Sequence, residues 1–136
     1  MLEQRIGLIG AGQMATALAH GFIRAGLTAA DRVLASDVDQ QARERFSKVT
    51  GAPTTADNSR VVSQSDVIVL AVKPQQLAGV ATGLRSQLGP DRLVVSIAAG
   101  VRLASLADWL GEDLRTIRVM PNTPCLIGQG ASAYSL

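Results

Sequence analysis

The sequence predicts an α/β fold, a single domain built on a doubly wound, mostly parallel sheet. The chain of 136 residues is long enough for one hydrophobic core. Hydrophobic residues make up 47% of it but aromatic residues only 3%. Ala, Val, Leu and Ile must therefore fill the interior, as they do in parallel strands covered by helices. Short apolar runs also alternate with helical patterns, and the connections are too long for hairpins.

The first unit is a strand at residues 4–9 followed by a helix from Gln13. The run QRIGLI is short and mostly apolar, which is typical of a buried strand. From Gln13 onward apolar residues recur at helical spacing, and this pattern ends near Gly26. The period changes at the glycine-rich segment between the two, which indicates a tight turn from strand to helix.

Two further units follow in the first half of the chain. Residues 32–36 predict the second strand, and the charged residues 38–48 predict an exposed helix. The third unit is short. Within residues 53–65 we expect a brief extended segment and a small helix, capped by either Asp57 or Asn58.

The second half of the chain alternates in the same way. Residues 66–72 end in six consecutive apolar residues, which favours a strand buried on both faces and therefore central in the sheet. Pro74 then stands where the first turn of a helix accepts proline. The remaining expected elements are a helix at 75–88, a strand at 92–97, a helix at 101–110, a strand at 115–120 and one more strand within GASAYS, residues 130–135.

Six strands joined by helices in this way predict the order 3-2-1-4-5-6. In such a sheet the chain winds in opposite directions from the first strand, and a crevice opens between strands one and four. Ligands of doubly wound sheets bind in this crevice, beyond the carboxyl ends of the strands. Residues that directly follow the strands are therefore the candidates for a site.

Composition argues against several classes of partner. The net charge is +2, and the basic residues do not gather in a cluster, so no nucleic acid is expected. No apolar run approaches the roughly 18–20 residues of a membrane span, and the first residues lack the pattern of a signal peptide. The one cysteine, Cys125, agrees with a reducing compartment. We expect a cytoplasmic protein without a membrane partner and, since no metal-ligand spacing is present, without a metal.

Gly10, Gly12 and Ala15 match the G-x-G-x-x-A fingerprint of Rossmann-like dinucleotide-binding domains. The match follows a predicted strand and opens a predicted helix, as the fingerprint requires. Gly10 permits the tight turn, Gly12 leaves room for a diphosphate, and Ala15 lets the helix lie close to the strand. The N–H groups expected to bind the anion, assisted by the helix dipole, are those of Ala11, Gln13 and Met14. A plain tight turn without a ligand is the alternative.

Ser36 and Asp37 end the second predicted strand, where the adenosine ribose of a dinucleotide would lie. Asp37 as a ribose ligand favours NAD(H), because its carboxylate repels the 2′-phosphate of NADP(H). The Ser36 hydroxyl favours NADP(H), since it could donate to that phosphate, and Arg43 or Arg45 could add positive charge. Alternatively, Asp37 only caps the following helix.

The nicotinamide half of the dinucleotide would emerge beyond the fourth predicted strand, at Ala71, Val72, Lys73 and Pro74. Lys73 is interpreted either as a functional cation or as an ordinary surface group. The small residues of SIAAG, 96–100, suit the passage of a planar ring or a tight turn alone. His20 lies inside the first helix and is interpreted as structural or solvated. No residue is identified as the catalytic acid or base.

Four motifs occur in order along nearly the whole chain: IGLIGAGQMATAL, AVKPQ, VSIAAGV and RVMPNTPCLIGQG. Together they resemble the cofactor-binding domain of the pyrroline-5-carboxylate reductase family, whose members catalyse the last step of proline synthesis. The resemblance implies hydride transfer from NADP(H), or from NAD(H), to the cyclic imine 1-pyrroline-5-carboxylate, which gives L-proline.

The resemblance also implies roles for individual residues. The phosphates would meet the turn from Gly10 to Met14, and Asn58 would contact the adenine side. The adenosine ribose would meet Ser36 and Asp37. The nicotinamide pocket would be lined by Val72, Lys73, Pro74, Ala98 and Ala99. The substrate would be bordered by Asn122, Thr123 and Pro124.

Members of this family continue into a helical domain that dimerises and binds the substrate. We expect residues 1–136 to form only the dinucleotide-binding domain, with that helical domain absent. The chain alone would then bind the dinucleotide but turn over slowly or not at all. A non-catalytic NAD(P)H-binding module and another imine or hydroxyacid reductase are the alternatives.

Overall fold

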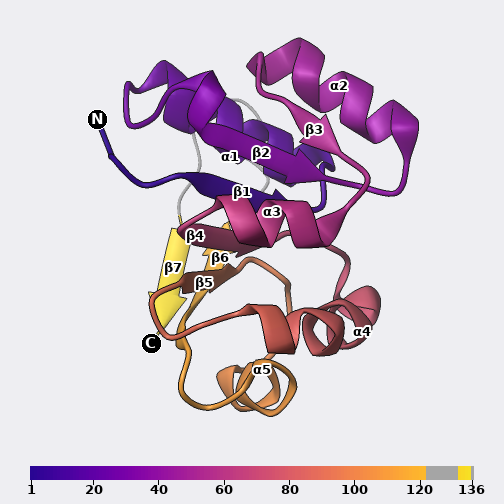
Figure 1. The fold of residues 1–136 in the computed structure, drawn as a ribbon, viewed down its shortest axis with the longest axis vertical. Helices are drawn as coiled ribbons and strands as arrows, with labels where there is room; N and C mark the ends of the chain where they lie inside the picture. The colour runs from indigo at the N-terminus through magenta and orange to yellow at the C-terminus, as the bar shows by residue number, and fades with distance from the viewer. Residues whose placement is uncertain (122–131, 136) are drawn as a thin grey trace.

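The computed structural model describes residues 1–121 and 132–135. Its centre is one sheet of seven strands in the order β3-β2-β1-β4-β5-β6-β7 (Figure 1). The predicted order of the first six strands is confirmed, and these six pair in parallel. The seventh strand, expected within residues 130–135, joins the edge and runs antiparallel to β6. The expected substrate-side residues 122–124 and Cys125 lie outside the described residues.

The observed elements match the expected ones, with shifted ends. The strands β1 to β7 span Ile6–Ile9, Val33–Ser36, Thr54–Thr55, Val67–Leu70, Leu93–Ser96, Arg115–Pro121 and Ser132–Ser135. The helices α1 to α5 span Gln13–Arg24, Gln40–Thr50, Asn58–Gln64, Pro74–Leu84 and Leu103–Leu110, and short 3-10 helices cover Ala30–Arg32 and Arg85–Gln87. No described helix combines the length and apolarity needed to cross a bilayer.

The first strand is shorter than the sequence predicts, because it begins at Ile6 and not at residue 4. The N–H of Arg5 donates to the Asp66 carboxylate at 2.8 Å instead of to a strand carbonyl. Its carbonyl accepts the N–H groups of Asp66 and Val67. Arg5 is thus bonded at the entrance of β4, and the regular ladder starts one residue later.

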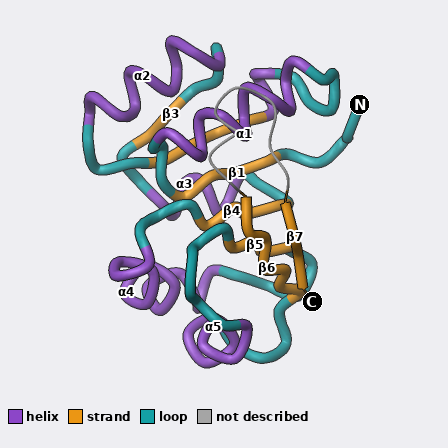
Figure 2. The backbone as a smooth tube through the Cα atoms, turned by 180° about the vertical axis from the view of Figure 1, so that it is seen from behind, coloured by secondary structure: helices purple, strands orange, loops and turns teal. Residues whose placement is uncertain are grey.

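Helices cover both faces of the sheet (Figures 1 and 2). On one face α1 and α2 pack over β1 and β2, in a core that includes the fully buried Leu8 and Phe46. On the other face α3, α4 and α5 pack in a second core, which includes Leu70 and Leu77. The strand β4 is central, as predicted, and three of its four residues are buried.

Capping side chains or a proline mark the first residues of three helices. Asp39 caps α2 by accepting the N–H of Gln41. Asp57 caps α3 in the same way, by accepting the N–H of Ser59. Of the two expected caps, Asp57 is therefore confirmed, and Asn58 is instead the first residue of the helix. Pro74 begins α4, as expected. Each cap satisfies an N–H group that the helix itself leaves without a partner.

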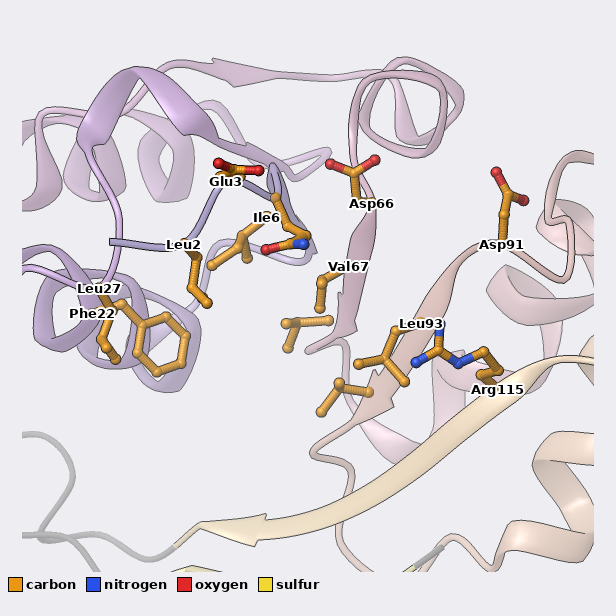
Figure 3. A pocket seen from close by; sticks show the side chains of 13 residues that line it. Leu2, Glu3, Ile6, Phe22, Leu27, Asp66, Val67, Asp91, Leu93 and Arg115 are labelled. Atoms are coloured by element: carbon orange, nitrogen blue, oxygen red, sulfur yellow. The ribbon is translucent and has the colours of Figure 1, made fainter.

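A cavity of about 780 Å³ lies beside β4 and β5, on the same face of the sheet as α1 (Figure 3). Phe22 and Leu27 line it from the end of α1, and Val67 and Leu93 line it from the sheet. These strand residues stand at the amino ends of β4 and β5. Val69 and Val95, each one residue before the end of its strand, also line it, but no residue of the predicted cofactor site does.

Candidate functional site

The turn between β1 and α1 lies at the carboxyl ends of the central strands. Gly10 adopts a φ of +104° there, and a Cβ at this position would stand 2.8 Å from the carbonyl oxygen of Ala71. The Gly10 N–H donates to the Ser36 carbonyl at 2.8 Å, and the Ala71 N–H donates to the Ile9 carbonyl at 2.8 Å. The turn is thus held between the ends of β2 and β4, and both its conformation and its surroundings require glycine.

The amino end of α1 is open to a ligand. Gly12 is the N-cap residue and is exposed, and no heavy atom lies within 4 Å of the place its Cβ would take. Among the described residues no side chain caps this helix. Its first N–H groups, including those of Gln13 and Met14, and the positive end of its dipole suit an anion. Ala15 is buried against the sheet, as the fingerprint predicts, so a diphosphate fits this position.

Asp37 holds the same turn from the end of β2. Its Oδ2 accepts the Ala11 N–H at 3.0 Å, and its Oδ1 accepts the Asp39 N–H at 3.0 Å. The expectation of a free N–H on Ala11 is therefore wrong, because Asp37 is its acceptor. The alternative that Asp37 caps α2 is also wrong, because Asp39 is the cap. The carboxylate of Asp37 links the β2–α2 turn to the glycine turn.

Replacing Asp37 by Ala should lower the free energy of unfolding by about 2 kcal/mol, because two N–H groups lose a charged acceptor. One of them belongs to Ala11, which is only 2% exposed. Urea denaturation followed by circular dichroism measures the change. Asp37→Asn keeps one acceptor oxygen and should lose less. Equal stability of Asp37→Ala and the unchanged chain would show that the link contributes nothing.

Ser36 and Asn58 form a contact that the sequence did not indicate. Ser36 is fully buried, and its hydroxyl donates to Oδ1 of Asn58 at 2.6 Å. The hydroxyl thus has an acceptor inside the fold, and its predicted contact with a 2′-phosphate stays a prediction. Asn58 is half-buried at the start of α3, and its side chain ties that helix to the end of β2.

The segments expected to meet the nicotinamide, residues 71–74 and 98–99, follow β4 and β5. These strands are adjacent and parallel, so both segments reach the same edge of the sheet as the glycine turn. Lys73 is exposed and directly precedes α4. Ala98 is buried whereas Ala99 is exposed. The structure thus brings the described part of the predicted cofactor site together.

A groove of about 400 Å³ between α1 and α2 adjoins this site. Gly12 lines it at the turn, and Thr16, His20 and Arg45 line it along the helices. His20, interpreted from the sequence as structural or solvated, is half-buried in this groove. The signal that places it here is its spacing: residues 12, 16 and 20 follow one another at intervals of four, which puts them on one side of a helix.

The family model described as NADP oxidoreductase, coenzyme F420-dependent, matches residues 5–100. A pyrroline-5-carboxylate reductase of Methanosarcina acetivorans is 41% identical over 135 residues, which are 99% of this chain and 50% of that protein. The solved structure of a pyrroline-5-carboxylate reductase from Coxiella burnetii has a TM-score of 0.92 at 34% identity, and the match covers 98% of this chain and 49% of the other. The solved structure of a Plasmodium falciparum pyrroline carboxylate reductase with NADP bound has a TM-score of 0.87 at 30% identity. This match covers 99% of this chain and 48% of the other.

These matches extend over nearly the whole chain, so the resemblance inferred from the four motifs is confirmed. The chain spans about half the length of the relatives that it matches. It belongs to the family described as NADP oxidoreductase, coenzyme F420-dependent, and is similar over its length to the pyrroline-5-carboxylate reductases.

Proposed function

We propose that this chain is the dinucleotide-binding part of a pyrroline-5-carboxylate reductase. When bound, NADP(H) or NAD(H) supplies the hydride that reduces the C=N bond of 1-pyrroline-5-carboxylate to L-proline. The observation that carries the proposal is the open amino end of α1, where Gly12 leaves space and no described side chain caps the helix. The similarity to a relative solved with NADP bound supports it.

The residues of this chain would bind and orient the dinucleotide. The N–H groups of Gln13 and Met14 are proposed to bind the diphosphate. The small Ala98 and Ala99, beyond β5, would let a planar ring lie close to the backbone. Val72, which packs against the core beneath the site, would exclude water from one side of that ring.

Hydride transfer also requires the imine to be held within reach of the nicotinamide. We propose that Asn122, Thr123 and Pro124 border the imine. We further propose that a helical domain of the kind this family has completes the site and forms a homodimer. On this proposal the 136 residues bind the dinucleotide but position the imine poorly.

The proposed setting is the cytoplasm. The sequence has a single cysteine, Cys125, and so does not depend on an internal disulfide, which agrees with a reducing compartment. The proposed partners are the small-molecule imine and a second copy of the complete protein.

A single-turnover experiment tests the proposed reaction. The chain is mixed with 1-pyrroline-5-carboxylate and with NADPH that carries deuterium at the transferred position, and the products are analysed by mass spectrometry. Singly deuterated L-proline should form at a rate at least about a thousandfold below that of a complete reductase, because positioning of the imine is lost.

Each contrary result has a distinct meaning. No deuterated proline above the protein-free control would favour a non-catalytic NAD(P)H-binding module. In a parallel mixture that contains a keto acid in place of the imine, deuterium transfer to the keto acid, with none to the imine in the first mixture, would identify another reductase of similar fold. A rate equal to that of a complete reductase would show that no further domain is needed.

A further inference from the structure

We infer that Arg43 is the residue with which this chain recognises the 2′-phosphate of NADP(H), and so selects NADP(H) over NAD(H). The inference rests on the proposed function, because it concerns the adenosine end of the proposed cofactor. The polar side chains near the end of β2, where the adenosine end of the cofactor would lie, include those of Ser36, Asp37, Asp39 and Arg43. Their bonds decide which of them can meet a phosphate.

The side chains of Ser36, Asp37 and Asp39 already bond to groups of the protein, and that of Asp39 accepts the Gln41 N–H at 3.0 Å. The Ser36 hydroxyl is buried and donates to Asn58. Each carboxylate oxygen of Asp37 accepts a backbone N–H, one from the glycine turn and one from the β2–α2 turn. Both N–H groups are neutral, so the carboxylate keeps its negative charge, and a cation beside it is needed to offset that charge where a phosphate binds.

Arg43 is held at the end of β2 from one turn inside α2. Its Nη1 donates to the Asp37 carbonyl at 2.8 Å and more weakly to the Val38 carbonyl at 3.4 Å. Both acceptors are neutral, so these bonds orient the guanidinium without neutralising its charge. Its Nε and Nη2 make no hydrogen bond with any residue that the structure describes. Val38 is 91% exposed, so the outer side of this turn is open to solvent.

This arrangement suits a phosphate monoester. A guanidinium presents N–H donors in a planar fork that matches two phosphate oxygens, and its charge persists at every physiological pH. The two hydrogen bonds to backbone carbonyls hold the Arg43 side chain in place before a ligand binds, so less conformational entropy is lost on binding. Arg45 is the competing candidate, but it is exposed and lines the groove between α1 and α2.

The test is a paired titration of the 136-residue chain with NADPH and NADH, followed by the fluorescence of the reduced nicotinamide. Arg43→Gln should raise the Kd for NADPH at least about tenfold and leave the Kd for NADH within about twofold, as expected for one charge-assisted contact. Arg43→Lys should recover part of the NADPH affinity, because it keeps the charge but not the fork. Arg45→Gln, the matched control two residues along the same helix, should leave both values unchanged.

The salt dependence of nucleotide binding is a second measurement, and Arg43→Gln would not change it if Arg43 had only a structural role. Rising salt should weaken NADPH binding more than NADH binding in the unchanged chain, and this difference should shrink in Arg43→Gln. An unchanged NADPH/NADH ratio in Arg43→Gln would overturn the inference, and so would an equal loss of both nucleotides or a loss of preference in Arg45→Gln alone. Failure of the unchanged chain to bind either nucleotide would instead overturn the proposed function.

Discussion

We expect Gly10→Ala to lower the free energy of unfolding by about 3 kcal/mol and to abolish cofactor binding. Two costs add: a non-glycine residue in a rarely populated backbone region costs about 1–3 kcal/mol, and overpacking costs a similar amount. The structure shows both, since Gly10 has a φ of +104° and its Cβ would stand 2.8 Å from the Ala71 carbonyl. The neighbour cannot easily move, because the Ala71 N–H is bonded to Ile9. Urea denaturation and thermal melting measure the loss.

Gly79→Ala is the matched control for this substitution. Gly79 is exposed inside α4, and no heavy atom lies within 4 Å of where its Cβ would be. Alanine there should raise stability by about 0.5–1 kcal/mol, because it loses less backbone entropy than glycine in a helix. If Gly10→Ala were as stable as the unchanged chain, the strained turn described here would not exist in solution.

We expect Gly12→Ser to leave the fold intact but to weaken NADPH binding by about a hundredfold. Serine at an N-cap accepts an N–H from the first turn of the helix and typically adds stability. In α1 that N–H belongs to Met14 or Ala15, the part of the helix proposed to bind the diphosphate. The new side chain also occupies the space in front of it. Losing one charge-assisted hydrogen bond and meeting a steric conflict accounts for a change of this size.

Gly12→Ala separates the two causes, because its methyl group adds bulk without a hydrogen-bond acceptor. We expect it to lose less affinity than Gly12→Ser and to be slightly less stable, since alanine is a poor N-cap. Fluorescence titration measures the affinity, and the melting temperature shows that each variant is folded. NADPH binding to Gly12→Ser at the original affinity would place the diphosphate somewhere other than the start of α1.

Much of the fold could be predicted from local patterns. The change of period at the glycines located the β1–α1 turn, and Pro74 located the start of α4. The apolar run at residues 67–72 identified the central strand, and the alternation of strands and helices gave the order of the first six. Each of these features depends on residues close together in the chain, so neighbours along the sequence suffice to reveal it.

The roles of polar groups at the site could not be predicted in the same way. Asp37 reaches Ala11 across 26 residues, and Ser36 reaches Asn58 across 22. Which bonds a carboxylate or hydroxyl at a strand end makes inside the protein decides which of its donor and acceptor sites are left for a ligand. The α/β architecture, the glycine turn and the edge of the sheet proposed to bind a ligand can all be predicted from the residues in their order. The bonds of Ser36 and Asp37 inside the protein and the position of Arg43 at the end of β2 become known from the folded chain, because packing sets which partners come within hydrogen-bonding distance.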